Sequence, residues 1–338
     1  MDREEPKIFT CRAGVEFGEK ICSALNHIYT KKEDLKGFTL SKAKVTQFAD
    51  TELKVEILEN IRDSDVFLVQ SLSNKSMDLS INENLMELLI FIDALRRAKA
   101  TRIIIVVPNM AYSRQDKQKG REPITAKLVA KMISTAGADG LITMDLHADQ
   151  VAGFYDIGID NLHGSKLIIG YLKEKFGNLS DWVFASPDAG GAARAEYYAK
   201  KLDAGYAISS KRRDYSQADT VEKIHLLGDV QGKKVCIVDD IISSAGTMVN
   251  AAMEIHKNGA VEIYAAATHA IFNDPAAEKI TKIYEEGILK EVIGIDTITQ
   301  TKRFKAENPW FKEVSAAPLL ANAIRNINRG LSVSKLYE

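Results

Sequence analysis

The clearest chemical signal in the sequence is a polar loop that directly follows an apolar run, within Val235–Thr247 (VCIVDDIISSAGT). Small residues let backbone N–H groups approach a ligand, and the start of the following helix adds partial positive charge, which together favour phosphate. Asp239 and Asp240 suit sugar hydroxyls or water-held Mg²⁺ instead. The segment predicts a phosphoribosyl-binding loop, supplemented by the hydroxyls of Ser243, Ser244 and Thr247. A serine N-cap after an acidic turn is the structural alternative.

A second loop of this kind is Ser186–Arg194 (SPDAGGAAR), which also follows an apolar run and opens a helical pattern. Gly190 and Gly191 would allow close approach of a diphosphate, and Asp188 could reach a metal ion. The alternative is a Pro-Asp-Gly turn that only joins a strand to a helix.

Thr143–Gln150 (TMDLHADQ) supplies a histidine at the end of a third apolar run. An isolated histidine there would usually be structural. His147 stands between Asp145 and Asp149, however, and that company favours a role in binding metal or ATP phosphates.

Basic residues cluster in two further segments. Residues 112–123 (YSRQDKQKGREP) are too polar to pack, and they indicate either a solvated loop or a mobile lid whose cations close on nucleotide phosphates. The triplet Lys211-Arg212-Arg213 is either surface decoration or a phosphate clamp facing the other loops.

The elements that must position these loops alternate between short β-branched runs and helical patterns. This alternation predicts βαβ units and an α/β fold with mostly parallel sheets flanked by helices. The expected order is strand 66–70, helix 84–99, strand 102–108, helix 125–135, strand 140–145, then strand 183–186, helix 190–202, strand 234–238, helix 246–258 and strand 261–268.

The two halves of the chain resemble each other. Thr125–His147 shifted by 122 positions lies on Thr247–His269 without gaps, each reading as a helix, a Gly-Ala break and a strand. We therefore predict two tandem domains, residues 1–162 and 163–338, with the last helix as a candidate for packing back on the first domain. The length of 338 residues also fits two domains.

Composition limits the classes of partner. The net charge of −1 gives no global sign of a nucleic-acid or anionic-membrane partner, and no apolar run is long enough to span a bilayer. The N-terminus lacks a signal-peptide pattern, and the three cysteines show no metal-ligand spacing and cannot pair evenly. These features indicate a cytoplasmic protein.

In this order the motifs resemble the ribose-phosphate diphosphokinase family, also called phosphoribosyl pyrophosphate synthetases. The resemblance runs nearly end to end, and plain phosphoribosyltransferases share just the acid-pair loop. It rests on residues 7–9, 84–90, 112–117, 123–129, 137–139, 143–147, 186–191, 238–240, 246–247 and 332–334.

The resemblance implies two tandem phosphoribosyltransferase-like domains, a requirement for Mg²⁺, and transfer of the β,γ-diphosphoryl group of ATP to the 1-hydroxyl of ribose 5-phosphate. Family members form dimer-based homo-oligomers, commonly hexamers, and many respond to phosphate and ADP. The implied ATP-side residues are Phe48, Asp50 and Glu52, offered to a neighbouring subunit, with Arg114, Gln115 and His147. The implied metal ligands are His147 and Asp188, the catalytic pair is Lys211 and Arg213, and ribose 5-phosphate would be held by Asp239, Asp240, Ser243, Ser244, Gly246 and Thr247.

The sequence departs from the family pattern in several places. Ser243 stands where a third acid is usual, Asp50 where asparagine is common, and Asn60 where many regulated members have serine. Two alternatives therefore stay open: a phosphoribosyltransferase, which needs neither the His147 motif nor a second domain, and a non-catalytic subunit that regulates a synthetase.

Overall fold

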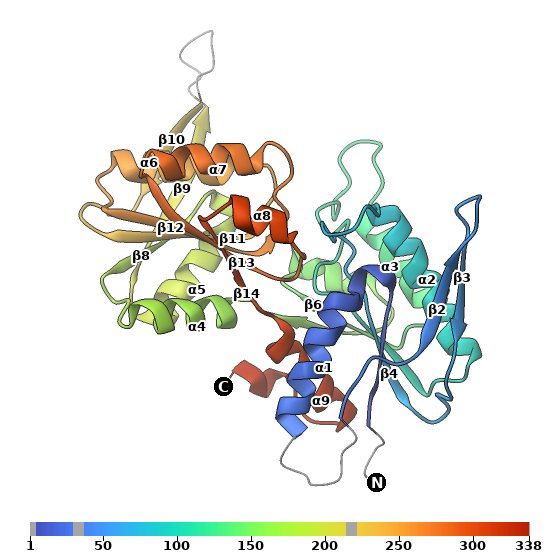
Figure 1. The fold of residues 1–338 in the computed structure, drawn as a ribbon. Coiled ribbons are helices and arrows are strands. Elements are labelled where there is room, and N and C mark those ends of the chain that lie inside the picture. Colours follow the sequence, from blue (N-terminus) through green and yellow to red (C-terminus); the bar gives the residue numbers. More distant parts are fainter. Residues whose placement is uncertain (1–4, 30–36, 214–221, 338) are drawn as a thin grey trace. The chain divides into compact units, whose positions relative to one another are not determined.

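The computed structural model describes residues 5–29, 37–213 and 222–337, with the side chains of residues 210–225 outside the description. The chain forms two compact units (Figure 1). Unit 1 comprises Met1–His163, Thr297–Gln300 and Ala316–Glu338, and unit 2 comprises Gly164–Asp296 and Thr301–Ser315.

Unit 1 is built on a five-stranded sheet in the order β1-β4-β5-β6-β7, with every neighbouring pair parallel. The interior strand β4, between β1 and β5, is buried at all five positions, as expected of a parallel strand covered on both faces. The strands are β1 (Lys7–Thr10), β4 (Asp65–Val69), β5 (Arg102–Val106), β6 (Gly140–Met144) and β7 (Gly158–Leu162).

Helices cover both faces of this sheet. Val66, Leu68, Ile103 and Ile105 share one core cluster with the apolar side chains of α2 and α3, and the alternating Phe67 and Ile104 are buried as well. Because successive strand residues point to opposite faces, both faces are packed. The helices are α1 (Val15–Tyr29), α2 (Ile81–Arg97), α3 (Thr125–Ala136) and α9 (Ala317–Asn328), with 3₁₀ turns η1 (Arg12–Gly14), η2 (Asp149–Phe154) and η4 (Ser334–Tyr337).

The C-terminal helix α9 returns to unit 1, where it packs against α1 (Figure 1). A buried carboxylate helps to hold it: Asp65 accepts hydrogen bonds from Arg102 Nε at 2.7 Å and from Asn328 Nδ2 at 3.1 Å. The division of the chain therefore falls after His163, and unit 2 ends at Ser315 rather than at the C-terminus.

Unit 2 contains a seven-stranded sheet in the order β10-β9-β8-β11-β12-β13-β14, parallel except for the β9–β10 pair. Its helices and strands alternate as the sequence predicts. The strands are β8 (Trp182–Ser186), β9 (Gly205–Arg213), β10 (Glu222–Leu227), β11 (Lys234–Ile242), β12 (Glu262–Ala270), β13 (Leu289–Ile295) and β14 (Phe311–Val314). The helices are α4 (Ser165–Phe176), α5 (Ala192–Leu202), α6 (Gly246–Lys257), α7 (Ala276–Glu285) and α8 (Lys302–Glu307), with the 3₁₀ turn η3 (Ala189–Gly191).

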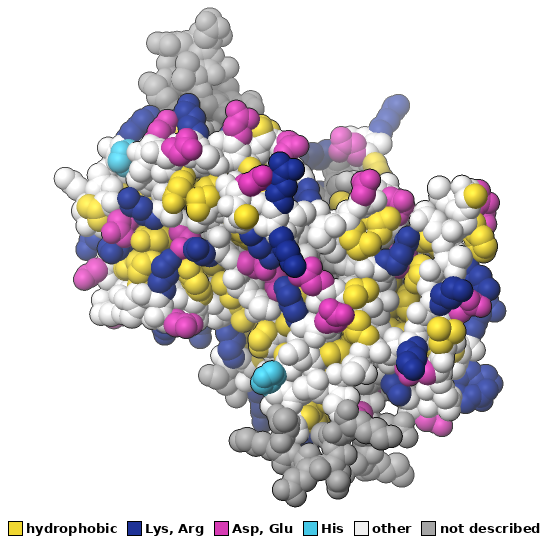
Figure 2. All heavy atoms as spheres, viewed as in Figure 1, with side chains coloured by type: hydrophobic (Ala, Val, Ile, Leu, Met, Phe, Trp, Pro, Cys, Tyr) yellow, Lys and Arg dark blue, Asp and Glu magenta, His cyan; other side chains and the backbone are white. Residues whose placement is uncertain are grey.

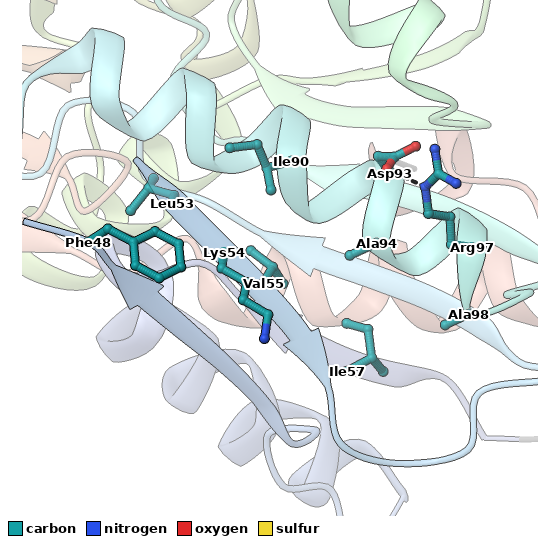
Figure 3. A pocket seen from close by; sticks show the side chains of 10 residues that line it. All are labelled: Phe48, Leu53, Lys54, Val55, Ile57, Ile90, Asp93, Ala94, Arg97 and Ala98. Atoms are coloured by element: carbon teal, nitrogen blue, oxygen red, sulfur yellow. Dashed lines mark hydrogen bonds and ion pairs between the residues drawn. The ribbon is translucent and has the colours of Figure 1, made fainter. Parts of the chain in front are cut away.

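A separate antiparallel hairpin, β2 (Ala43–Gln47) and β3 (Leu53–Ile57), lies beside α2. A groove of about 660 Å³ runs between β3 and that helix, with Phe48 of the hairpin tip at one end (Figure 3). Leu53, Val55 and Ile57 line it from the hairpin, and Ile90 lines it from α2.

The internal repeat is visible in the elements. Each copy has a helix, a glycine with positive φ (Gly137 at 107° and Gly259 at 88°) and then a strand. The end of the repeat differs between the copies, because His147 is exposed beyond β6 whereas His269 is buried within β12.

The surface carries mixed charge. On the face drawn in Figure 2, basic and acidic side chains are interspersed rather than separated into fields of one sign. Within the described ranges, no helix has the length and apolar character that crossing a membrane requires. Cys11, Cys22 and Cys236 are buried free thiols.

Candidate active site

The acid pair of unit 2 lies within strand β11 rather than just after it. The strand continues through Asp239 and Asp240 to Ile242, paired with β12 on one side. Asp240 is buried, at 6% exposure, whereas the Asp239 side chain is 23% exposed. The strand thus brings both carboxyl groups to its C-terminal end, where ligands of parallel α/β sheets bind.

Arg194 neutralises this pair from α5. Its Nη1 donates to Asp239 Oδ1 at 2.8 Å, and its Nη2 lies 3.3 Å from Asp240 Oδ1. Burial, together with the adjacent Asp240 carboxyl, nevertheless raises the pKa of Asp239 to about 7, and Arg194 opposes that rise. The acid pair is therefore poised to exchange a proton, or a cationic partner, near neutral pH.

The turn after β11 leads directly into α6. Ala245 adopts a left-handed conformation with φ of 58°, and its side chain makes no capping hydrogen bond, so it leaves the first-turn N–H groups without a side-chain cap. Asn273 Nδ2 donates to Ser243 Oγ at 3.2 Å and so fixes one wall of the turn. Backbone donors and the positive end of the helix dipole are both suited to a phosphate.

Lys279, a residue outside every motif of the sequence, adds a cation to this turn. Its Nζ donates to Ser244 O at 3.4 Å and lies 3.9 Å from where a Cβ on Gly246 would be. No salt bridge to an acid is found for it among the described residues. A cation beside a helix N-terminus is unfavourable unless an anion joins them. No motif signals this contact, because Lys279 is 35 residues away along the chain.

The second loop of unit 2 is a tightly constrained turn between β8 and α5. Asp188 Oδ1 accepts a hydrogen bond from Gly191 N at 3.1 Å, and Ser186 Oγ donates to Asp188 O at 2.6 Å. A Cβ on Gly191 would lie 2.5 Å from Ser186 Oγ, so the turn requires glycine there. Asp188 is exposed and can use its second oxygen for a ligand.

In unit 1, His147 follows β6 and is exposed. Asp145, two residues earlier, has φ of 37° and accepts a hydrogen bond of 3.2 Å from the ring of His163. That hydrogen bond raises the pKa of His163. The strained backbone at Asp145 turns the chain so that the His147 segment leaves the strand.

The proposed lid, residues 112–123, contains no helix or strand. Arg114 and Gln115 are exposed, and the loop's start is fixed because Gln150 Nε2 donates to Asp116 Oδ2 at 2.6 Å. Within the described part of the chain, none of the lid cations forms an ion pair; these are Arg114, Lys117, Lys119 and Arg121.

The tip of the β2–β3 hairpin, residues 48–52, carries three predicted ATP contacts. Phe48 is 48% exposed, and Asp50 and Glu52 are exposed too. The tip is internally ordered, since Phe48 N donates to Glu52 O at 2.9 Å and Glu52 N to Asp50 Oδ1 at 3.2 Å.

The basic pair Lys211 and Arg213 lies at the end of β9, where their backbones pair with Ile224 and Glu222 of β10. Their side chains lie outside the description, so their predicted catalytic role stays a prediction.

The donor set fits Mg²⁺ held jointly by protein and substrate. No three His, Cys, Asp or Glu side chains gather into a metal cage anywhere in the described ranges. Mg²⁺ usually keeps several waters and takes one or two carboxylates plus substrate phosphates. The exposed carboxylate of Asp188 and the pair Asp239–Asp240 match that mode, whereas the imidazole of His147 is not a usual Mg²⁺ ligand and its metal role stays a prediction.

These features define a phosphoribosyltransferase-like α/β protein whose second unit has an acid pair followed by a helix start without a side-chain cap. The family model "N-terminal domain of ribose phosphate pyrophosphokinase" matches residues 6–137, and the "phosphoribosyl synthetase-associated domain" model matches residues 215–338. The chain belongs to the ribose-phosphate pyrophosphokinase family.

Curated relatives of this family match along almost the whole chain. The ribose-phosphate pyrophosphokinase of Fusobacterium nucleatum is 42% identical over 98% of this chain and 98% of its own length. The Bacillus subtilis enzyme is 41% identical over 98% of this chain and 96% of its own length. The crystal structure of phosphoribosylpyrophosphate synthetase from Mycobacterium smegmatis is 34% identical, with a TM-score of 0.82 over 96% of this chain and 99% of that one.

Proposed function

We propose that this protein transfers the β,γ-diphosphoryl group of ATP to the 1-hydroxyl of ribose 5-phosphate, giving phosphoribosyl pyrophosphate and AMP. The observation that carries the proposal is the turn from Asp239 to Thr247, in a chain of this family. It joins an acid pair, a helix start without a side-chain cap and the ammonium of Lys279. The first suits sugar hydroxyls, and the other two suit a phosphate.

We propose that ribose 5-phosphate binds the turn from Asp239 to Thr247. The backbone N–H groups from Gly246 onward, the hydroxyls of Ser244 and Thr247, and Lys279 hold the 5-phosphate. Asp239 and Asp240 accept hydrogen bonds from the ribose hydroxyls, for which Arg194 keeps the pair in place.

We propose that ATP binds to residues of unit 1. The base meets Phe48 with the tip carboxylates Asp50 and Glu52, and the phosphates meet Arg114, Gln115 and His147. Aromatic stacking and guanidinium–phosphate pairing are the interactions that these side chains offer.

His147, Asp188 and the acid pair are the residues that would hold Mg²⁺ with the substrates, and a bound Mg²⁺ would neutralise charge on the phosphate oxygens. Omitting Mg²⁺ and adding EDTA should abolish turnover.

The reaction needs no covalent enzyme intermediate. The 1-hydroxyl oxygen forms a bond to the β-phosphorus while the bond from that phosphorus to the α–β bridging oxygen breaks, and the hydroxyl proton passes to solvent. The protein's part is alignment and stabilisation of charge on the transferring group. Lys211, Arg213 and the lid cations are the proposed charge-stabilising groups.

We also propose a cytoplasmic homo-oligomer. The tip of the hairpin exposes Phe48 and two acids in the isolated chain, which is what a segment donated to a neighbouring subunit would present. Light scattering in the presence and absence of phosphate would measure the assembly, and a monomer in both would contradict it.

A single assay separates this function from its rivals. With ATP, Mg²⁺ and ribose 5-phosphate, AMP should appear in step with phosphoribosyl pyrophosphate. Turnover of added phosphoribosyl pyrophosphate with a nucleobase would instead identify a phosphoribosyltransferase. Absence of both reactions would favour a non-catalytic subunit. Asp50 and Ser243, which depart from the family pattern, are the residues that suggest this alternative.

A further inference from the structure

The hairpin that carries the proposed ATP-binding tip has few anchors. β2 and β3 pair with each other and form a sheet separate from the five-stranded one. Val45, Val55 and Ile57 pack against the core of unit 1. The groove of Figure 3, however, runs along β3 from Leu53 to Ile57 and separates this strand from part of α2, so packing of the hairpin on that helix is incomplete. A polar contact at the tip end of β2 can therefore contribute to the direction of the tip.

Arg12 supplies such a contact from η1. Its backbone N donates to Glu87 Oε1 at 2.7 Å, its Nε donates to Glu87 Oε2 at 2.8 Å, and its Nη1 donates to Gln47 Oε1 at 3.1 Å. Gln47 is the last residue of β2 and immediately precedes Phe48. One side chain thus joins η1, α2 and the base of the tip.

This link is rigid because Glu87 is fully buried. A buried carboxylate requires a charged or hydrogen-bonding partner, and Arg12 contacts both of its oxygens. A planar guanidinium held at two points has little freedom to turn. Its Nη2 is buried and has no partner within the described residues, so Glu87 and Gln47 determine where the head lies.

We infer that Arg12, held by Glu87, is a positioning residue that aims the hairpin tip through Gln47 for binding of the adenine nucleotide. The inference rests on the proposed function, because it assumes that ATP meets the tip. In this inference Arg12 acts through Gln47 and not by contact with the nucleotide. Since the tip is ordered internally, the loss of this link should swing the tip as a unit and weaken ATP binding, with the chemical step unaffected.

Two variants break the link at different ends. Gln47→Met removes the exposed acceptor and leaves the buried ion pair intact. Arg12→Met combined with Glu87→Gln removes the guanidinium, while the Gln carbonyl still accepts from the backbone N–H of residue 12. The paired substitution is preferred because Arg12→Met by itself would leave a buried carboxylate uncompensated and could unfold the protein.

Each variant should raise the KM for ATP about fivefold to tenfold, which is the upper part of the range for losing one ordinary, solvent-exposed hydrogen bond. For the Gln47→Met variant, the KM for ribose 5-phosphate and kcat should stay within about twofold of the wild-type values. Its melting temperature should stay within about 2 °C of that of the wild type. Adding Gln47→Met to the paired variant should produce no further rise, because both break the same link. Lys54→Met is the matched control. It removes the exposed Lys54–Glu56 pair on the same hairpin and should leave all constants unchanged.

Phe48→Ala separates failure of the inference from failure of the proposed function. If Phe48→Ala raises the KM for ATP and Gln47→Met does not, the positioning role is refuted while the function stands. If neither changes that constant, the tip does not serve ATP, and the inference falls as well. If Gln47→Met lowers kcat and raises the KM values for both substrates by similar factors, its role is merely structural. That result would also overturn the inference. Formation of AMP by the wild-type protein independently decides the proposed function.

Discussion

At the residue scale, the acid pair determines how the candidate site responds to pH. The pKa of Asp239 is raised from its ordinary value to about 7, first by burial and then by Asp240. A carboxyl with a raised pKa stabilises the folded state at low pH, and that contribution is lost as the pH rises through the folded-state pKa. The apo protein should therefore lose stability from this group between about pH 4 and pH 7.

Asp239→Asn tests this sign. Between pH 5 and pH 8, the free energy of unfolding of the wild type should fall relative to that of the variant by about 2–3 kcal/mol. Urea unfolding at several pH values measures the difference. A difference between the two proteins that does not change with pH would show that Asp239 titrates in its ordinary range.

Lys279 provides a second prediction at this scale. Lys279→Met should raise the KM for ribose 5-phosphate at least about tenfold, because a charge-assisted contact to phosphate is worth roughly 1.5–3 kcal/mol. The KM for ATP should be unchanged. Lys282→Met is the matched control, since Lys282 is an exposed lysine on the same helix. Equal effects of the two substitutions in steady-state kinetics would remove Lys279 from the site.

At the element scale, strand–turn–helix junctions were the parts that local sequence could predict. Val235–Thr247 and Ser186–Arg194 each join a strand to a helix, because apolar runs, small residues and helical periodicity are local signals. The exact ends of the strands were harder to predict from the sequence. Strand β11, for example, includes the acid pair that was expected to follow it.

The contacts of Arg194, Lys279 and Arg12 could not be predicted in the same way. Each contact joins residues that are far apart in the chain. The separation is 45 residues between Arg194 and Asp239, 35 between Lys279 and Ser244, and 75 between Arg12 and Glu87. Hydrophobic periodicity carries no information about which polar side chains meet across elements. The roles of Lys211 and Arg213 remain predictions from the family resemblance.

The β8–α5 turn yields a prediction at the element scale. Gly191→Ala should lower kcat/KM for ribose 5-phosphate more than tenfold, because the new Cβ would lie 2.5 Å from Ser186 Oγ and the turn would have to shift. Ser186→Ala removes that oxygen and should restore part of the loss in the double variant. A double variant as impaired as Gly191→Ala would mean that another contact causes the defect.

At the scale of the whole molecule, each of the two units contains one copy of the segment that the sequence repeats. Both copies keep the helix, glycine and strand, but one ends in the exposed His147 and the other in the buried His269. The C-terminal helix α9 belongs to unit 1, as was predicted for the last helix.

The proposed donation of the tip to a neighbouring subunit predicts complementation between inactive variants. Phe48→Ala and Arg114→Ala subunits, dissociated and reassembled in equal amounts, should recover up to about a quarter of wild-type activity, because that fraction of interfaces combines both intact parts. Activity no higher than that of the unmixed variants would place tip and lid in the same subunit's site.

The most direct test of the central claim follows the phosphorus atoms of ATP. With Mg²⁺ and ribose 5-phosphate, label from [γ-³²P]ATP and from [β-³²P]ATP should both appear in the sugar product, while label from [α-³²P]ATP should remain in AMP. Transfer of the γ label with retention of the β label in ADP would contradict diphosphoryl transfer and refute the account.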